Sequence, residues 1–189
     1  MMSAGRGQQS LRIIAGQWRS RKIVFPDLPQ LRPTPDRVRE TLFNWLMPVI
    51  SGARCLDLFA GSGALGLEAL SRGAAEVVFV DSDRQVQAYL NDTLRLLGAG
   101  NASVVQSEAL RYLAQPAQAF DIVFLDPPYQ SELLQPCCQA LESQVWLGPH
   151  AHIYIETASQ QPTPQLPGNW TVLREKTAGQ VCYRLARRG

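Results

Sequence analysis

Short apolar runs alternate with longer segments of helical period from residue 53 onward, and this alternation restricts the fold more than any other feature. The apolar runs lie at 54–58, 76–81, 103–106, 120–125 and 152–156, and each has the length and composition of a buried strand. Helices are predicted between them, ending near residue 72 and spanning 83–97, 108–114 and 131–143. Strands that alternate with helices predict a doubly wound, mostly parallel α/β sheet.

Hairpins are predicted at both ends of this alternating region. Runs at 171–175 and 181–185 flank Ala178-Gly179 and predict an antiparallel C-terminal pair, which brings the sheet to seven strands. Near the N-terminus, runs at 11–15 and 21–25 flank a turn and predict a small hairpin. A helix is expected over 35–47, with Thr34 as its N-cap and Pro35 at its first position. We therefore expect an irregular tail and a hairpin extension within 1–33, and one α/β domain over 34–189.

The composition is that of a globular protein and excludes several other classes. Of 189 residues, 46% are apolar and 18% are charged, so the chain can bury a core. No apolar run reaches the ~18 residues of a membrane span, and the N-terminus lacks the apolar segment of a secretory signal. The four cysteines show neither disulfide nor zinc spacing. We expect a cytoplasmic protein with reduced thiols, no metal and no membrane partner.

Basic residues are concentrated in the first 39 positions, although the net charge of the chain is only +2. Eight cations stand there against Asp27 and Asp36, whereas the other 150 residues hold ten cations and fourteen acids. The eight are Arg6, Arg12, Arg19, Arg21, Lys22, Arg32, Arg37 and Arg39. A basic arm on an acidic body indicates a polyanionic partner, and a solvated tail is the structural alternative.

A glycine-rich turn follows the first strand of the alternating region. Gly61, Gly63 and Gly66 match G-x-G-x-x-G between a strand and a helix, and Asp81 ends the next strand 20 residues after Gly61. This spacing is typical of a nucleotide site whose carboxylate binds the ribose hydroxyls. Asp57 ends the first strand, where a carboxylate would repel a pyrophosphate but suit an ammonium group. S-adenosylmethionine carries an ammonium, a sulfonium and a ribose without phosphate, so it is the expected cofactor.

The cofactor site is expected to draw on three strand ends. Its residues at the first two are Asp57, Phe59, Ala60, Gly61, Ser62, Gly63, Asp81 and Ser82. After the third strand, Glu108 could accept a hydrogen bond from the adenine amino group, with Ala109 beside it. Ser107 could instead be the N-cap of the short helix there, and the two roles are compatible.

Asp126-Pro127-Pro128-Tyr129 comes directly after the fourth strand, at the edge where open α/β sheets bind ligands. The amine of a nucleobase is a poor nucleophile because its lone pair is delocalised into the ring. The Asp126 carboxylate and the Pro127 carbonyl can accept its two N–H bonds, and Tyr129 can stack on the base. We therefore expect Asp126, Pro127 and Tyr129 to be catalytic residues for methyl transfer to a base amine, with Asp126 also beside the cofactor.

These motifs, in this order, resemble the class I S-adenosylmethionine-dependent methyltransferases that modify exocyclic amines. More narrowly, the chain from about residue 11 to its end resembles the RsmD family, on the stretches 12–22, 31–46, 56–63 and 125–129. The Arg32-Pro33-Thr34 stretch is specific to that family, whereas the other motifs mark the superfamily. At Ser107-Glu108 this chain departs from relatives that often carry Asp.

The RsmD family consists of bacterial methyltransferases that act on guanine N2 in 16S ribosomal RNA. The resemblance implies a Rossmann-like methyltransferase domain, and as substrate a guanine of the type at position 966, within the small ribosomal subunit. It places Thr34 and Arg37 beside the methionine end of the cofactor. We expect a monomer whose hairpin contacts the RNA through Arg12, Trp18, Arg19, Arg21 and Lys22, with packing of the hairpin as the other role open to Trp18.

Three alternatives remain open from the residues alone. A DNA adenine-N6 methyltransferase would use Asp126–Tyr129 equally well, although the chain leaves little room for a target-recognition domain. An NAD-dependent oxidoreductase would use the glycine pattern but leave Asp126–Tyr129 without a role. A catalytically silent RNA-binding factor on this fold would bind RNA without turnover. His150 and His152 have no visible partners in the sequence and are assigned no role.

Overall fold

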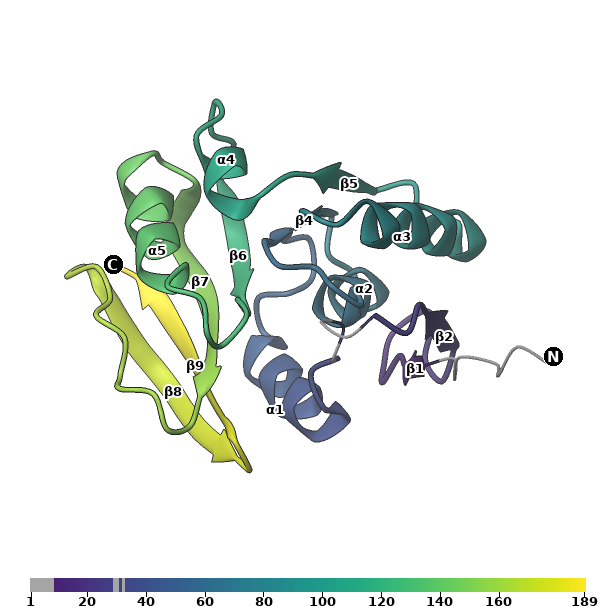
Figure 1. Cartoon of the computed structure of the whole chain (residues 1–189), viewed down its shortest axis with the longest axis horizontal. Coiled ribbons are helices and arrows are strands. Elements are labelled where there is room, and N and C mark those ends of the chain that lie inside the picture. The colour runs from purple at the N-terminus through teal and green to yellow at the C-terminus, as the bar shows by residue number, and fades with distance from the viewer. Residues whose placement is uncertain (1–8, 29–30, 32) are drawn as a thin grey trace, which may run out of the picture.

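The computed structural model describes residues 9–28, 31 and 33–189, which form a seven-stranded sheet with helices on both faces and a separate hairpin (Figure 1). The sheet strands are β3 (Arg54–Asp57), β4 (Glu76–Asp81), β5 (Ala102–Gln106), β6 (Phe120–Leu125), β7 (Leu147–Ala158), β8 (Trp170–Ala178) and β9 (Val181–Arg188). The helices are α1 (Asp36–Leu46), α2 (Ala64–Ser71), α3 (Arg84–Leu97), α4 (Ala109–Leu113) and α5 (Leu134–Ser143). The hairpin is β1 (Gln9–Arg12) with β2 (Lys22–Phe25). The predicted fold class is confirmed.

The strand order β5-β4-β3-β6-β7-β9-β8 places β3 and β6 side by side at the centre of the sheet. The chain runs outward from β3 to β5, returns to the centre, and then runs outward in the other direction from β6. The strands from β5 to β7 are parallel, whereas β9 is antiparallel to both β7 and β8. In such sheets the reversal of order opens a crevice at the carboxyl ends of the strands, which is where ligands bind.

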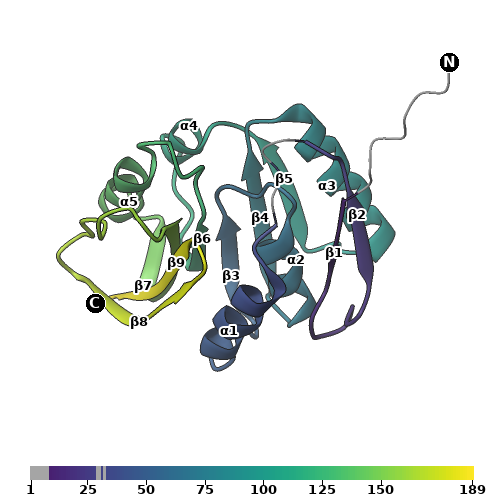
Figure 2. The ribbon, with the colours of Figure 1, turned by 60° about the horizontal axis from the view of Figure 1, so that its bottom comes forward.

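Two apolar layers hold the helices against the sheet, because successive strand residues point to opposite faces. On one face, α1, α2 and α3 contribute Phe43, Leu67 and Leu90 to a cluster that includes Phe79 and Phe124 of the strands. On the other face, α4 and α5 contribute to a second cluster, with members Leu113, Leu141, Leu56, Val123 and Ile155. Figure 2 shows α1 and α2 beside β3 and β4, and α5 beside β6 and β7. The two layers leave the carboxyl ends of the strands uncovered.

Two predicted helix caps are wrong. Helix α1 begins at Asp36 with Pro35 as its N-cap, and no side chain caps it. The Thr34 side chain instead hydrogen-bonds Asp126, so its hydroxyl serves the site and not the helix. Helix α4 has Glu108 as its N-cap, also without a side-chain cap bond, and the Ser107 hydroxyl donates to the Glu108 carbonyl.

Several strands differ in extent from the prediction: β8 and β9 are longer than the predicted runs at 171–175 and 181–185, and residues 13–15 of the first predicted hairpin strand lie outside β1. Strand β7 spans Leu147–Ala158 because the pairing register with β6 shifts between Phe120 and Ile122. Such a bulge lets a strand continue through Gly148-Pro149, which reads as a loop in the sequence. Strand β1 begins at Gln9, inside the predicted irregular tail, and residues 1–8 lie outside the described part of the chain.

All four cysteines are free and buried. Burial raises the pKa of the Cys137 and Cys138 thiols to about 12, so both are protonated and unreactive at neutral pH. Within the described residues, no helix has the length and apolar character that crossing a membrane requires.

Candidate active site

Acidic side chains stand at the carboxyl ends of neighbouring parallel strands. Asp57 pairs with Phe124 across β3 and β6, and Phe124 pairs with Tyr154 across β6 and β7. Asp126 and Glu156 lie two residues beyond those partners, so alternation along each strand turns both toward the same face as Asp57. Asp81 ends β4 on the other side of β3. The topology thus gathers carboxylates that are far apart in the chain.

These carboxylates line a cleft of about 920 Å³, with a small recess of about 70 Å³ against the glycine-rich turn. A cleft of this size accommodates a nucleoside-sized ligand together with part of a second molecule. The acidic lining residues are Asp57, Asp81, Asp83, Glu108, Asp126 and Glu156. Within the described residues the lining holds no Lys, Arg or His. The cleft is therefore suited to a ligand with positive charge and not to a pyrophosphate.

Asp57 is almost completely buried at the floor of the recess. Burial raises the pKa of its carboxyl to about 7, and the negative charge of Asp81 adds to the rise. The backbone N–H of Gly66 donates to Asp57 Oδ2 at 3.0 Å and opposes the shift. An ammonium group placed in the recess would favour the ionised form of this carboxyl.

Asp81 organises the glycine-rich turn in addition to lining the cleft. Its Oδ2 accepts the Gly61 N–H at 2.9 Å, and its Oδ1 accepts the Asp83 N–H at 2.9 Å. Each carboxylate oxygen can accept a second hydrogen bond, so the ribose hydroxyls of a bound nucleoside remain possible donors. The two backbone hydrogen bonds hold the Asp81 carboxylate in position for the ribose hydroxyls.

Two of the three glycines pack closely against neighbouring side chains. Gly63 has φ +75°, and a Cβ there would stand 2.5 Å from Leu90 Cδ2. A Cβ on Gly66 would stand 2.2 Å from Phe79 Cε1. Gly63 does not line the cleft or the recess, so its predicted cofactor contact is not seen in the structure. It acts indirectly, by letting α2 begin directly under the cleft.

The carboxyl group of Asp126 faces the cleft beside Thr34. Its pKa lies well above the usual value, mainly because of burial, with the charges of Glu156 and Asp57 adding to the rise. The Thr34 hydroxyl donates a hydrogen bond that opposes the shift. The protein thus holds three acids close together and leaves their repulsion uncompensated, which is typical of functional sites.

The two backbone carbonyls that follow Asp126 differ in whether they accept hydrogen bonds within the described residues. The Pro128 carbonyl accepts hydrogen bonds from the backbone N–H of Ser131 at 2.8 Å and its hydroxyl at 2.7 Å. The Pro127 carbonyl has no hydrogen-bond partner among the described residues. Because Pro127 lines the cleft next to Asp126, the two can act as a pair of acceptors.

Tyr129 lies at the mouth of the cleft, and a hydrogen bond fixes the position of its hydroxyl. The hydroxyl donates to Glu156 Oε1 at 2.6 Å, and Gln161 Nε2 donates to the Tyr129 carbonyl. The side chain is 36% exposed, so one part of the ring is free to contact a ligand. Its pKa is raised by burial and by Glu156, so the hydroxyl stays protonated.

The structure brings most of the predicted site residues together. Those that line the cleft or its recess are Thr34, Asp57, Phe59, Ala60, Gly61, Ser62, Asp81, Ser82, Glu108, Ala109, Asp126, Pro127 and Tyr129. Arg37 does not: it is an exposed residue on α1 outside the lining. Glu156 was not predicted, although an acid directly after the apolar run 153–155 repeats the pattern of Asp57 and Asp126.

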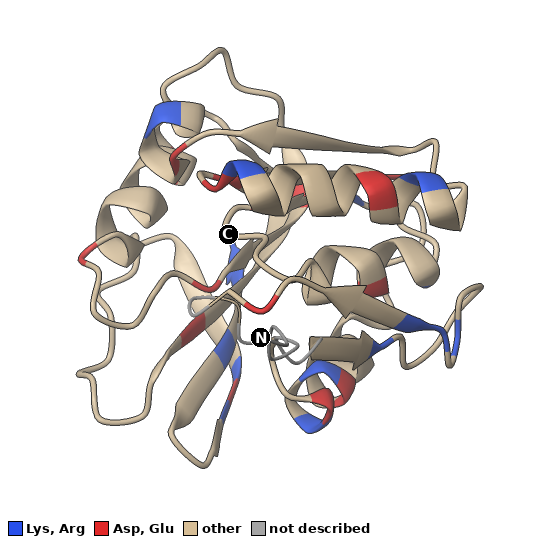
Figure 3. Ribbon diagram, turned by 45° about the vertical axis from the view of Figure 1, so that its right-hand side comes forward, with Lys and Arg blue, Asp and Glu red and all other residues tan. Residues whose placement is uncertain are grey.

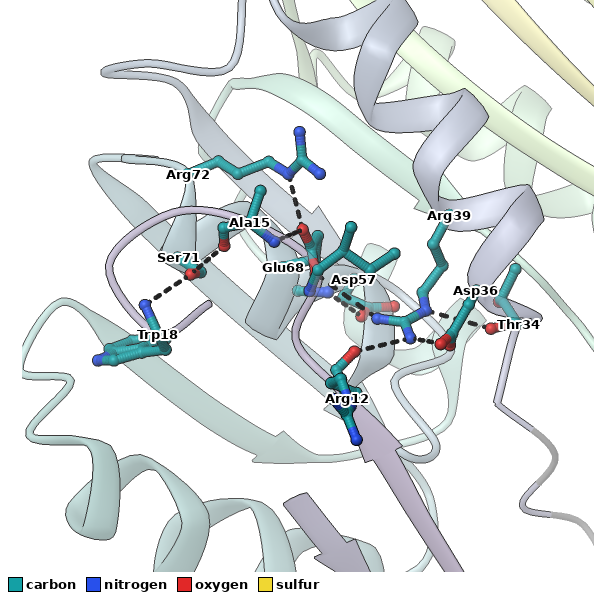
Figure 4. A network of polar contacts seen from close by, with 12 residues as sticks. Arg12, Ala15, Trp18, Thr34, Asp36, Arg39, Asp57, Glu68, Ser71 and Arg72 are labelled. Carbon is teal, nitrogen blue, oxygen red and sulfur yellow. Dashed lines mark hydrogen bonds and ion pairs between the residues drawn. The ribbon is translucent and has the colours of Figure 1, made fainter. Parts of the chain in front are cut away.

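The N-terminal hairpin is attached to α2 through a buried acid (Figure 4). The backbone N–H groups of Ile14 and Ala15 donate to the carboxylate of Glu68 at 2.9 and 3.0 Å, and Arg72 Nε donates to it at 2.7 Å. Gly16 has φ +84°, and a Cβ there would lie 1.8 Å from the Ser71 carbonyl oxygen, so only glycine allows this approach. The docked loop is part of the folded body and not a loose tail.

Arg39 joins the hairpin, α1 and α2 (Figure 4) and is fully buried, which corrects its place in the predicted basic arm. Its guanidinium donates to the backbone carbonyls of Arg12 and Thr34, and its Nη1 lies 3.5 Å from Glu68 Oε2 as an ion pair. This Nη1 makes no hydrogen bond within the described structure. Arg39 is thus a structural cation and is not available to a polyanion.

The other described cations of the hairpin are exposed, and Figure 3 shows basic residues along it. Arg12, Arg19, Arg21 and Lys22 are exposed and form no ion pair within the described part of the chain. Trp18 is only 9% exposed and belongs to the apolar cluster, so of its two expected roles the structure shows packing. Arg6 and Arg32 lie outside the described residues.

Comparison with known proteins shows the family of this chain. A family model described as Conserved hypothetical protein 95 matches residues 11–187. The chain is 55% identical over 98% of its length to Ribosomal RNA small subunit methyltransferase D of Escherichia coli K12, of which it covers 92%. It is 49% identical over 93% of its length to the protein of that name from Haemophilus influenzae, again covering 92%. A solved structure described as putative methyltransferase yhhF from Escherichia coli has TM-score 0.90 and 52% identity, covering 95% of this chain and 98% of that one.

A cleft of acids at the switch point of a seven-stranded sheet with this strand order defines a class I S-adenosylmethionine-dependent methyltransferase. The residues present fit that cofactor, because its ammonium and sulfonium are cationic and the described lining of the cleft holds a buried carboxylate and no Lys, Arg or His. Within this class, the chain belongs to the RsmD family.

Proposed function

We propose that this protein transfers a methyl group from S-adenosylmethionine to the exocyclic N2 of a guanine in 16S ribosomal RNA. The proposal is supported by the relatives that carry the name small subunit rRNA methyltransferase D. The observation that carries it is the pair of acceptors formed by the Asp126 carboxylate and the Pro127 carbonyl, at the edge of a cleft lined by acids. We expect the target to be a guanine of the type at position 966, methylated by a cytoplasmic monomer on the small subunit.

Each site residue has a distinct task in this reaction. Asp126 and the Pro127 carbonyl accept the two N–H bonds of the amine, which favours a tetrahedral nitrogen whose lone pair is available for attack. Tyr129, held by Glu156, supports the face of a base that has left its stack. When bound, S-adenosylmethionine supplies an electrophilic methyl group on its sulfonium. Asp57 and Asp81 are the residues that would hold its ammonium and its ribose.

The exposed cations of the hairpin are the proposed RNA contacts. Arg12, Arg19, Arg21 and Lys22 are exposed on a body that is otherwise acidic. Phosphate contacts make affinity depend on salt, and four of them to single-stranded RNA predict a slope of log K against log salt of about −3. Because Arg39 and Glu68 anchor the hairpin to α1 and α2, RNA bound to the hairpin would be held in a fixed position relative to the cleft.

The decisive test is methyl transfer to small ribosomal subunits from cells that lack the enzyme. With radiolabelled S-adenosylmethionine, the wild-type protein is expected to label 16S rRNA, and nuclease digestion should yield N2-methylguanosine. An Asp126→Ala variant that binds S-adenosylhomocysteine normally should leave the particle unlabelled. The proposal is wrong if the folded wild-type protein produces no N2-methylguanosine on particles or on free 16S rRNA.

The same measurements separate the alternatives. N6-methyladenine from a DNA substrate would indicate a DNA adenine methyltransferase. A melting temperature raised by NADH and not by S-adenosylhomocysteine would indicate an oxidoreductase, since a ligand that binds the folded state stabilises it. RNA binding without any methylated product would indicate a catalytically silent factor.

A further inference from the structure

Glu156 lines the cleft, and so far its only described task is to hold the Tyr129 hydroxyl. Ile155 pairs with Leu125 across parallel strands, so Glu156 stands next to Asp126 at the carboxyl edge of the sheet. It lies on the side of Asp126 away from β3 and β4, whose ends carry the cofactor residues. A base whose amine is held by Asp126 would therefore extend toward Glu156.

The carboxylate of Glu156 is fixed in place as a hydrogen-bond acceptor. Tyr129 donates its hydroxyl to Oε1 and Tyr154 donates to Oε2, both at 2.6 Å. Burial raises the pKa of Glu156, whereas these two hydrogen bonds lower it and favour the ionised form. No cation pairs with this carboxylate within the described residues, and each oxygen retains a second lone pair.

The edges of the purine bases differ at the atom beside the target amine. In guanine, N2 is flanked by the N1–H donor, whereas in adenine N6 is flanked by N1 without hydrogen, which is an acceptor. A fixed carboxylate beside the amine therefore gains a hydrogen bond with guanine and faces a lone pair with adenine. Buried polar groups that lose their partner discriminate strongly between substrates.

We propose that Glu156 selects guanine by accepting a hydrogen bond from its N1–H while Asp126 and the Pro127 carbonyl hold N2. This inference rests on the proposed function and names its specificity determinant. It also explains how Asp-Pro-Pro-Tyr, which suits either purine amine, can serve guanine in this protein. Glu156 has a second contact, with the Tyr129 hydroxyl, so a purely supporting role for that ring is the competing explanation.

The test compares guanine with 2-aminopurine, which keeps the 2-amino group but has no hydrogen on N1. Small subunits are reconstituted with 16S rRNA that carries either base at the methylated position, introduced by ligation of a synthetic segment. Single-turnover methyl transfer is then measured with the wild-type protein, Glu156→Gln and Tyr129→Phe. Any effect of the missing O6 is common to all three proteins, so a change in the guanine to 2-aminopurine ratio reports on the substituted residue.

The wild-type protein is expected to prefer guanine by at least ~100-fold, and Glu156→Gln to prefer it by less than ~10-fold, because an amide can turn its N–H toward N1 of 2-aminopurine. Tyr129→Phe should slow both substrates and leave the ratio unchanged. An unchanged ratio in a folded Glu156→Gln variant would overturn the inference, since a supporting role lowers both rates equally.

The wild-type ratio can overturn the inference even if Glu156→Gln fails to fold. Equal rates on guanine and 2-aminopurine would show that N1–H is not recognised and would overturn the inference while leaving the proposed function intact. No product from guanine particles would overturn the proposed function itself. Melting temperature and its increase with S-adenosylhomocysteine establish that each variant is folded and binds the cofactor product.

Discussion

Two clusters of charged side chains, one around Glu68 and one around Asp126, differ in whether opposite charges face each other. Where the hairpin docks, Glu68 is surrounded by Arg39, Arg72 and two backbone N–H groups. In the cleft, Asp126 has Asp57 and Glu156 as charged neighbours, and the described lining supplies no cation. The first group is compensated by cations of the chain, whereas among the described residues the second has no cation beside it.

The difference shows which group is structural and which awaits a ligand. Burial of a charge is costly unless a partner of opposite charge and hydrogen bonds replace water. Glu68 has its partners in the folded chain, so it fastens the hairpin. Burial raises the pKa of Asp57 and of Asp126, and the charges of neighbouring acids add to the rise; a cationic cofactor or a base amine can supply a partner.

A substitution in the cluster around Glu68 should have the largest effect on stability. Arg39→Met removes the ion pair with Glu68 and the hydrogen bonds to the carbonyls of Arg12 and Thr34. We expect the free energy of unfolding to fall by about 3 kcal/mol, because Glu68 keeps Arg72 but loses one cation, and two backbone carbonyls lose their donor. Denaturant unfolding measures the change, and trypsin should cut the loosened hairpin faster.

Arg37→Met is the matched control for that change, because Arg37 is an exposed residue of the same helix. It should alter the free energy of unfolding by less than ~0.5 kcal/mol. Equal losses from the two variants would contradict the distinction between a structural cation and a surface one.

A substitution among the acids of the cleft should lower activity and raise stability. Asp126→Asn removes one of three neighbouring acids, so we expect the melting temperature of the protein without cofactor to rise. Methyl transfer should fall by ~10²–10³-fold, the usual cost of losing one preorganised electrostatic contact. Thermal melts and single-turnover rates measure both effects. A less stable variant would contradict the repulsion between the acids. A fully active variant would contradict the role of Asp126 in the reaction.

The smallest expected effect is a pH dependence of cofactor binding through Asp57, whose pKa is about 7. If the bound ammonium requires the carboxylate, affinity for S-adenosylhomocysteine should rise about tenfold from pH 6 to pH 8 and level off above. The contribution to stability has the opposite sign. An acid whose pKa is raised on folding binds its proton more tightly in the folded state, so stability falls as pH rises from about 4 to about 7.

Calorimetric titrations at several pH values test this dependence, with Asp57→Asn as the control. That variant should bind more weakly at pH 8 and show a flat profile. A wild-type profile that is also flat would mean that Asp57 does not meet the ammonium.

Patterns along the chain predicted the helices and strands well, because neighbouring residues determine them. They failed for Thr34 and Gly63, whose contacts are with residues distant in the sequence. The apolar runs and glycine turns indicated the parallel strands and helices correctly, because periodicity reports which face is buried. Thr34 has the chemistry of a helix cap, but the carboxylate of Asp126, 92 positions later in the chain, takes its hydrogen bond. Gly63 matched a ligand-binding pattern, yet packing against Leu90 of α3 explains it.

The sequence by itself determined the doubly wound sheet, the glycine-rich turn and the Asp126–Tyr129 segment, because each depends on neighbours in the chain. The roles of Arg39 and Glu156 were decided only by the tertiary structure. Arg39 reaches a carbonyl 27 positions away, and Glu156 meets a tyrosine hydroxyl 27 positions away. From the sequence, a charged residue with no known partner is expected at the surface. Only the fold shows that Arg39 is buried against the opposite charge of Glu68, and that Glu156 is buried beside Asp126, which carries the same charge.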